Sequence, residues 1–501
     1  MNLNIKIHLE TAASNRRGFI RSFIGGLGLA VSALALTTGL VGCASTPGAS
    51  VASGANGQAD KPPIVFVHGN GDSAALWQTT LWRFESNGWP TNRLHAIDMP
   101  YPLARDVDAT AQPGRTSTSE AAEFLKREVD KVLRETGAAK VVLMGNSRGG
   151  YAIRNYITNY GGAALVSHAV LGGTPNHGVW ATKGLREGNE FSGTGPFLTA
   201  LNAPKNAQGD EVVGPVKWLT VRSDNNDKFA QPDGLWIGSK GTPTNVTFDG
   251  PALKGATNVV LAGVDHRETS FSPAAFAAAH AFITGNSSTT AQVLPIAAAS
   301  SVVLNGKIVG LGLNPLDAAS GNYVNNLPLA GAQLSVFETN PATGVRKGAA
   351  VHTKQVGADG MWGPFVTTSA APSATYEFVL QAAGYATTHI YRSTFARSSS
   401  VVHLRAERLA DADKTAGASI TFSRPRGYFD LQRDRMLFDG SSALPGVTGP
   451  GAGVASSKLL LKAEAGQTTP RSISAEFNGE KITGLAWPAA DNRVVVLELT
   501  Y

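Results

Sequence analysis

The hydrophobic pattern changes twice along the chain and divides it into three regions. Residues 1–60 hold one long apolar stretch, 23–42, followed by small and polar residues. From 61 to 286, short and fully apolar runs alternate with segments whose apolar residues recur every three or four positions. From 287 to 501, short β-like runs alternate with Gly, Pro, Asn and Asp turns. The pattern predicts a leader, then an α/β domain, then an all-β region built as a sandwich or barrel.

The middle region is predicted to form a doubly wound, mostly parallel sheet. Its apolar runs cover 63–69, 93–102, 139–145, 167–173, 216–223 and 257–263. Helical periods cover 74–88, 117–136 and 149–160, and the second of these opens with a Ser117-x-x-Glu120 capping box. Strands that alternate with helices in this way are typical of a parallel sheet with helices on both faces.

Composition and charge exclude some partners. Charged residues make up 16% of the 501, which suits a packed, turn-rich protein better than a disordered one. The formal charge of +6 falls to +3 once residues 1–42 are set aside, because they hold four basic residues and one acidic residue. Such an even balance gives no reason to expect a nucleic-acid partner.

The first region predicts export and a lipid anchor. Arg16 and Arg17 precede the apolar stretch and resemble a twin-arginine signal over residues 1–42. "LVGC" (40–43) resembles a lipobox, which implies acylation of Cys43, the only cysteine, and a flexible tether over 43–60. The expected location is a membrane surface facing the periplasm or the outside of the cell, on the outer membrane in a Gram-negative cell. An uncleaved transmembrane anchor is the alternative.

Ser147 stands in "GNSRGG", between the strand predicted at 139–145 and the helix that follows it. A nucleophile elbow needs glycines around its serine, because the strained strand-to-helix turn leaves no room for side chains. Gly145, Gly149 and Gly150 meet this need. A chance match in a chain with 56 glycines is the alternative.

Two later strands supply the partners that a nucleophilic serine needs. The strand at 257–263 is followed by His266, and the strand at 216–223 is followed by three acids, Asp224, Asp227 and Asp233. Because the topology supplies such a triad in the chain order Ser, Asp, His, we expect Ser147, His266 and one of these aspartates to form a catalytic site. His280, on an apolar helix, is expected to pack in the core.

The neighbours of these residues suggest supporting roles. The backbone N–H groups of Asn70 and Arg148 are the expected oxyanion donors. His68 is expected to brace the first loop, whereas the side chain of Arg148 either contacts substrate or forms a hydrogen bond at the rim. A calcium loop starting at Asp224 lacks the required Gly and Glu, and no metal or organic cofactor is expected.

A long insert, 174–215, follows the strand at 167–173. It carries Trp180, Phe191, Phe197 and Leu198 among glycines. An insert beside the nucleophile is predicted to form a lid or a wall for the acyl chain, and an ordinary surface loop is the alternative.

Four motifs together resemble the lipases of the α/β-hydrolase superfamily. They are "FVHGNGDS" (66–73), "GNSRGG" (145–150), "GGTPNHG" (172–178) and "GVDHRETSFSP" (263–273). The loop "SDNNDKFAQP" is similar to the acid loop of several lipases, and this likeness favours Asp227, with Asp224 in reserve. The resemblance covers about 61–285 and implies the α/β-hydrolase fold.

The tail is predicted to contain two β-rich modules, 287–408 and 409–501. Residues 375–405 resemble the C-terminal β-domain of archaeal-type lipases, which implies lipid binding there. Trp362, Tyr385 and Tyr391 are the aromatics expected to be exposed for lipid or polymer. A purely structural appendage is the alternative.

These features predict an exported, lipid-anchored serine esterase or lipase that cleaves carboxylic esters, such as acylglycerols, through an acyl-enzyme. The expected partners are an ester or lipid substrate and the membrane that holds the anchor. A polyester depolymerase or acyltransferase with the same triad, and a non-catalytic protein that binds lipid or polymer, are the alternatives. Acyl chain length, alcohol preference and oligomeric state stay open.

Overall fold

The computed structural model describes residues 61–237, 242–298, 300–314, 316–317, 322–367, 373–447, 453–463 and 470–501. The predicted signal sequence, Cys43 and the tether lie outside these residues. In the part of the chain that the structure describes, no helix is both long enough and apolar enough to cross a membrane.

Six parallel strands form the sheet of the first half, in the order β2-β1-β3-β4-β5-β6. They are β1 Ile64–Val67, β2 Leu94–Ile97, β3 Val141–Asn146, β4 Val166–Gly172, β5 Lys217–Ser223 and β6 Thr257–Leu261. Each lies within one residue of an apolar run that the sequence predicts to be a strand, so the predicted parallel sheet is confirmed. Because all six run the same way, the residues that follow β3, β5 and β6 lie at one edge.

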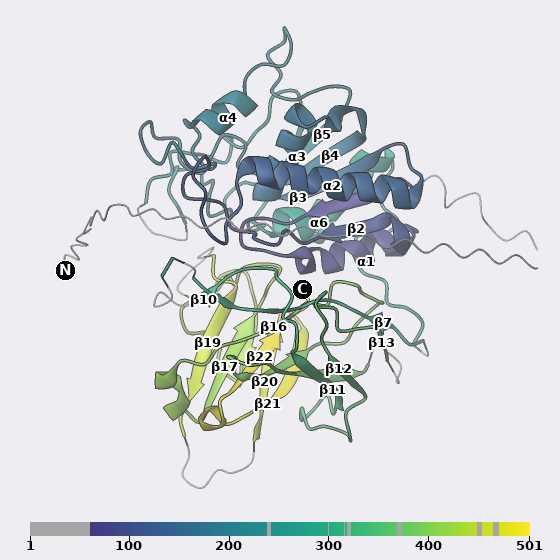
Figure 1. Cartoon of the computed structure of the whole chain (residues 1–501), viewed down its shortest axis with the longest axis vertical. Helices are drawn as coiled ribbons and strands as arrows, with labels where there is room; N and C mark the ends of the chain where they lie inside the picture. The colour runs from purple at the N-terminus through teal and green to yellow at the C-terminus, as the bar shows by residue number, and fades with distance from the viewer. Residues whose placement is uncertain are drawn as a thin grey trace, which may run out of the picture. The chain divides into compact units, whose positions relative to one another are not determined.

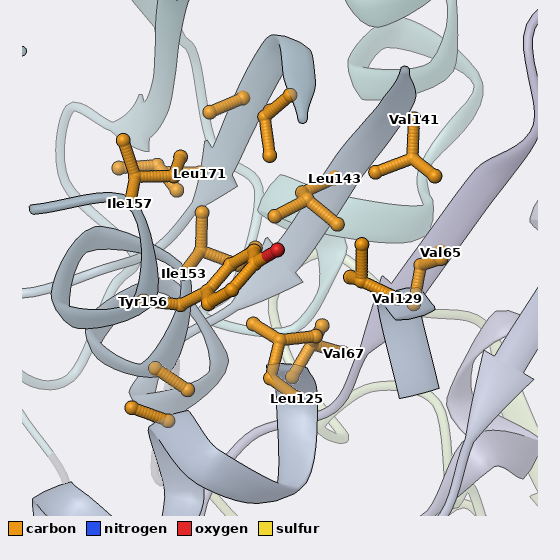
Figure 2. Close-up of a cluster of buried hydrophobic side chains, with 14 of the residues drawn as sticks. Val65, Val67, Leu125, Val129, Val141, Leu143, Ile153, Tyr156, Ile157 and Leu171 are labelled. Atoms are coloured by element: carbon orange, nitrogen blue, oxygen red, sulfur yellow. The ribbon is translucent and has the colours of Figure 1, made fainter. Parts of the chain in front are cut away.

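Helices cover both faces of this sheet (Figure 1). They are α1 Gln78–Ser86, α2 Thr118–Thr136, α3 Arg148–Asn159, α4 Pro196–Leu201, α5 Glu268–Phe271 and α6 Pro273–Thr284, with 3-10 turns at Ala74–Trp77, Thr91–Arg93 and Gly162–Ala164. Along β1, Val65 and Val67 pack against α2 and α3, whereas Ile64 and Phe66 pack on the face of α1 and α6. The first of these cores is drawn in Figure 2. A strand buried on both faces explains why its sequence is apolar at every position.

The capping box predicted at the start of α2 is present. The backbone N–H of Glu120 donates to Ser117 Oγ over 3.2 Å, and the backbone N–H of Ser117 donates to Glu120 Oε2 over 2.8 Å. His280 of α6 is buried against Phe84, Trp89 and Phe276. It is therefore a core residue, as expected.

The second half is rich in β-structure and contains several sheets. The largest has seven strands in the order β12-β11-β14-β15-β22-β17-β19. Its strands are β11 Gln333–Thr339, β12 His352–Gln355, β14 Thr375–Gln381, β15 Thr387–Arg392, β17 Ala418–Ser423, β19 Ser456–Leu461 and β22 Arg493–Glu498. The smaller sheets pair β7 Val303–Leu304 with β13 Phe365–Val366, β8 Ile308–Gly310 with β16 Leu404–Ala406, β9 Gly312–Leu313 with β10 Asn322–Tyr323, and β20 Arg471–Phe477 with β18 Met436–Phe438 and β21 Glu480–Ala486. Short 3-10 turns occupy Asp411–Thr415 and Ala489–Asp491.

The predicted boundary near residue 409 lies between two hydrophobic cores, but one sheet contains strands from both sides of it. One apolar cluster draws mainly on residues before 409 and the other almost entirely on residues after it. The last strand, β22, nevertheless lies between β15 and β17 and runs parallel to both. The C-terminal strand thus joins the two predicted modules into one sheet.

The aromatics expected to be exposed in this region are not. Trp362 and Tyr391 are fully buried, and Tyr385 is half-buried beneath the guanidinium of Arg408, 4.4 Å from its ring centre. The prediction of an exposed aromatic surface at these three positions is wrong. The sequence of a strand does not show which of its aromatic side chains face the core when the elements that pack on the strand are unknown.

Candidate active site

Ser147 lies at the turn between β3 and α3 in a strained backbone conformation. Its φ is 51° and its ψ is −121°, a region that residues other than glycine rarely adopt. A Cβ on Gly149 would lie 2.4 Å from the carbonyl oxygen of Val67, and one on Gly145 would lie 2.7 Å from Ile153 Cδ1. The close approach of α3 to β1 therefore requires glycine at 149, and its close approach to β3 requires glycine at 145.

His266 and Asp227 are in direct contact. The Nδ1 atom of His266 lies 3.0 Å from Asp227 Oδ1 and 2.9 Å from Asp227 Oδ2, and both side chains are buried. A carboxylate at Nδ1 favours the tautomer that carries its proton there, which leaves Nε2 as a proton acceptor. Phe229 lies edge-on to the imidazole, with ring centres 4.7 Å apart. Its backbone N–H donates to Asp227 Oδ1 over 2.9 Å.

The other candidate acids have different partners. Asp224 Oδ1 accepts a hydrogen bond of 3.0 Å from the backbone N–H of Gly263, and so ties the acid loop to the loop that carries His266. Asp233 accepts from the backbone N–H of Leu235. Within the described ranges, no group of three or more His, Cys, Asp or Glu side chains is placed to hold a metal ion. Of the three aspartates, Asp227 is the one at the imidazole.

Ser147 and His266 line the same cavity, which has a volume of about 430 Å³. Asn146, the residue before the serine, donates from Nδ2 to the backbone oxygen of His266 over 3.2 Å and to Ser270 Oγ over 2.8 Å. Thr269 Oγ1 donates to the same oxygen of His266 over 2.7 Å. The serine turn and the histidine loop are therefore hydrogen-bonded to each other beside the cavity that both of them line.

The predicted oxyanion donors flank the serine. Asn70 follows β1 and lines the cavity, and its side-chain oxygen accepts from the backbone N–H of Ala104 over 2.7 Å. A Cβ on Gly69 would lie 3.1 Å from Ser147 Cβ, which shows how closely this loop approaches the serine. Arg148 is the first residue of α3. The backbones of Asn70 and Arg148 thus border Ser147 from two elements.

His68 braces the loop after β1. Its Nε2 accepts from the backbone N–H of Met99 over 3.0 Å, and its Nδ1 lies 2.9 Å from the carbonyl oxygen of Gly69. Burial lowers the pKa of His68, so its neutral form is favoured. This arrangement matches the expected bracing role.

Two family models match parts of the chain. Residues 62–208 match the family described as alpha/beta hydrolase fold, and residues 300–409 match the family described as lipase C-terminal domain. The sheet and helices of the first half thus match the α/β-hydrolase fold, and part of the β-rich second half resembles a lipase C-terminal domain. Residues 410–501 lie outside both matched ranges.

Solved structures similar to this chain include three with low sequence identity and low TM-scores. Lipase B of Aspergillus fumigatus is 16% identical with a TM-score of 0.32, over 47% of this chain and 56% of that protein. The propeptide form of lipase BlEst2 from Bacillus licheniformis is 15% identical with a TM-score of 0.32, over 85% of this chain and 93% of the other. Phospholipase PlaB of Legionella pneumophila is 11% identical with a TM-score of 0.32, over 70% of this chain and 95% of that protein.

Arg148 of the α/β-hydrolase domain is held by the insert. Its Nε and Nη2 lie 2.7 and 2.9 Å from the two carboxylate oxygens of Glu190, and Nη2 also donates to the carbonyl oxygen of Thr116 over 2.6 Å. All of these groups are buried. The role that the sequence left open for this side chain is therefore structural, and its partner Glu190 was missed. A buried arginine calls for a carboxylate partner, but the sequence does not say which one.

The insert contributes two aromatics to the cavity. Trp180 and Phe191 line it, whereas Phe197 and Leu198 pack with Tyr151 of α3 and are not part of its lining. The predicted apolar wall is thus built from part of the segment 174–215.

The C-terminal region also lines the cavity, a contact that the sequence pattern does not predict. Tyr428, Gly453 and Ala455 form part of its wall. Lys228, the residue after Asp227, places Nζ 4.6 Å from the ring centre of Tyr428 and 4.9 Å from that of Phe229. Burial lowers the pKa of Lys228 to about 8. Residues outside both family matches therefore contribute to the site of the α/β-hydrolase domain.

Proposed function

We propose that this protein is a serine hydrolase of carboxylic esters. The observation that carries the proposal is the shared cavity: a strained Ser147 and a His266 held by Asp227 both line it. Nucleophile, base and orienting acid are the three roles that acyl transfer by a serine requires.

The reaction follows from these three side chains. His266 Nε2 takes the proton from Ser147 Oγ as the oxygen attacks the acyl carbonyl. The C–O bond to the alcohol then breaks, and the alcohol leaves with the proton from the imidazolium. Water, activated by the same imidazole, attacks the acyl-enzyme and releases the acid. Asp227 holds the ring and stabilises its charged form.

Two backbone N–H groups, of Asn70 and Arg148, would stabilise the tetrahedral oxyanion. Each such donor contributes about 3 to 4 kcal/mol of transition-state stabilisation in comparable sites. Their places beside Ser147, on the loop after β1 and at the start of α3, support this assignment.

Acyl esters of lipid type are the substrates that the cavity favours. Trp180, Phe191, Phe229 and Trp236 line it, and aromatic walls bind hydrocarbon chains. The matched lipase C-terminal domain supports the same class. Polyester hydrolysis and acyl transfer would use the same three side chains, and product analysis separates them, because only an acyltransferase accumulates acylated alcohol.

We further propose that the protein is exported and held at a membrane by lipid on Cys43. The support is the sequence alone: paired arginines, an apolar stretch and "LVGC". Two or three acyl chains would anchor the chain firmly. Labelling of expressing cells with radioactive palmitate should mark the wild type but not Cys43→Ala, and equal labelling of both would refute the anchor.

Hydrolysis of p-nitrophenyl esters of graded chain length tests the function, with residues 43–501, Ser147→Ala and Ser119→Ala compared. Ser119 lies on α2, where its hydroxyl contacts that of Ser117, and it serves as the matched control. We expect Ser147→Ala to lose hydrolysis at all chain lengths and Ser119→Ala to keep it. Undiminished hydrolysis in Ser147→Ala would refute the mechanism, and no hydrolysis by any form would favour a binding protein.

A further inference from the structure

Two buried carboxylates flank His266. Asp265 Oδ1 accepts hydrogen bonds of 2.8 Å from the backbone N–H groups of Arg267 and Glu268. The carboxylate of Glu268 in turn accepts from the backbone N–H of Asp265 over 2.8 Å. These bonds fold the loop back on itself around the histidine, so the position of His266 depends on both carboxylates.

Both carboxylates are bound by arginines from the C-terminal β-region. Arg424 lies 3.1 Å from Asp265 Oδ2 through Nη1 and 2.5 Å from Glu268 Oε1 through Nη2. Arg433 lies 2.5 Å from Glu268 Oε2 through Nη1. The side chains of Asp265, Glu268 and Arg424 are all buried, and that of Arg433 is 29% exposed. The arginine cluster, Arg424 and Arg433, therefore closes over the loop of the proposed base.

The loop needs these cations. Two neighbouring carboxylates away from water repel each other, and their burial is unfavourable unless positive charge lies next to them. Burial and the charge of Asp265 raise the pKa of Glu268, while Arg424 and Arg433 act in the opposite direction. Without the arginines, the carboxylates would have to move toward water or take up a proton, and His266 would move with them.

The segment that carries Arg424 also reaches the cavity through Tyr428. The backbone N–H of Tyr428 donates to Asp265 Oδ2 over 2.7 Å, and its carbonyl oxygen accepts from Arg424 Nη1 over 2.6 Å. Arg267 donates to the carbonyl oxygen of Pro425 over 2.8 Å and lies 5.2 Å from the ring centre of Tyr428. A single turn of chain thus binds the histidine loop and places an aromatic ring in the cavity wall.

We propose that three residues of segment 424–433 are working parts of the active site: Arg424 and Arg433 position His266 through Asp265 and Glu268, and Tyr428 closes one side of the substrate cavity. The inference rests on the proposed serine hydrolase function. Arg424 and Arg433 are positioning residues, since they touch the loop of the base and not the reacting atoms. The segment lies outside both matched ranges, 62–208 and 300–409.

This role differs from that of a lipid-binding appendage. A surface that only binds lipid aggregates affects emulsified substrate and leaves soluble short esters untouched. A segment that positions the base affects every ester, because proton transfer from Ser147 occurs in each reaction. Misplacement of a catalytic group by about 1 Å lowers rates by roughly 100-fold.

The test compares Arg424→Met with Arg426→Met in the otherwise unchanged protein, with soluble p-nitrophenyl butyrate as substrate. Arg426 is also a buried arginine of this segment, but it donates to the carbonyl oxygens of Leu499, Thr500 and Ala75 and not to the histidine loop. We expect kcat per folded molecule to fall roughly 10- to 100-fold in Arg424→Met with KM within about twofold, and to stay near wild type in Arg426→Met. The rate at which a p-nitrophenyl phosphonate inactivates the enzyme should fall in parallel with kcat, since it depends on the same base.

Arg433→Gln keeps the test valid if Arg424→Met does not fold. Arg433 is partly exposed and its loss leaves Arg424 in place, so we expect a folded protein whose kcat is lowered about two- to fivefold. The proposal would be overturned if Arg424→Met and Arg433→Gln both kept the wild-type kcat. It would also be overturned if kcat fell equally in Arg424→Met and Arg426→Met. Wild-type hydrolysis that survives Ser147→Ala would instead overturn the proposed function, so the two failures are distinguishable.

Discussion

The guanidinium of Arg148 is paired through two nitrogens with the carboxylate of Glu190, although the two residues belong to different segments around the serine turn. The pair ties the insert 174–215 to α3 one residue after Ser147. Because both side chains are buried, water does not share in the interaction. The insert is therefore fixed to the site at this point by a charged contact.

Breaking the pair between Arg148 and Glu190 should destabilise the folded protein. Arg148→Met or Glu190→Gln leaves one buried group without its partner, which we expect to lower the free energy of unfolding by about 3 to 5 kcal/mol. The double variant should lose less than the sum of the two single losses, because no unpaired charge remains. Urea unfolding of all four proteins measures the coupling. Additive losses would show that the pair contributes nothing specific.

The contact between Asp227 and His266 predicts a difference between neighbouring aspartates. Asp227→Asn should lower kcat by about 10³- to 10⁴-fold, because the amide can no longer hold the Nδ1–H tautomer. Asp224→Asn keeps an oxygen that can accept from the N–H of Gly263, so its kcat should change by less than about tenfold. Steady-state kinetics on a soluble ester compare the two. A larger loss of kcat in Asp224→Asn than in Asp227→Asn would indicate that Asp224 is the acid of the triad.

Lys228 predicts a pH dependence of stability. Its pKa is lowered from 10.5 to about 8 in the folded protein, so between these pH values the unfolded chain holds a proton that the folded chain has lost. Stability of the wild type therefore rises with pH in this window relative to Lys228→Met. The advantage of Lys228→Met in unfolding free energy should shrink by about 1.4 kcal/mol per pH unit from about 8 to 10.5. A difference that does not vary with pH there would contradict the lowered pKa.

Trp180 predicts a change in chain-length preference. Trp180→Ala removes an aromatic ring from the cavity wall and with it apolar contact to a long acyl chain, so the ratio of kcat/KM for long over short esters should fall by about five- to twentyfold. Phe197→Leu is the control, because Phe197 packs on Tyr151 and is not part of that wall. Its ratio should match that of the wild type. If the ratio of kcat/KM for long over short esters did not change in Trp180→Ala, the acyl chain would not bind against Trp180.

Local patterns predicted the framework of the site. Strands buried on both faces are apolar at each position, and a capping box needs only four neighbouring residues, so β3 and α2 were visible in the sequence. The order of Ser147 and His266 followed from the topology. Choosing Asp227 required a resemblance to other lipases, since three aspartates follow the same strand.

Contacts between distant segments could not be predicted in this way. Glu190 reaches Arg148 from an insert without regular pattern, and Arg424 reaches Asp265 across 159 residues. The buried state of Trp362 depends on its packing against strands elsewhere in the β-region. Such contacts depend on how packed layers meet, and one sequence alone does not specify this.

Covalent labelling of the nucleophile tests the central claim most directly. The protein is treated with a fluorophosphonate, digested, and its peptides are analysed by mass. The account predicts a single phosphonylated serine, Ser147, with labelling at least about 100-fold slower in His266→Ala because the base is missing. Labelling at another serine, or at an undiminished rate in His266→Ala, would contradict it.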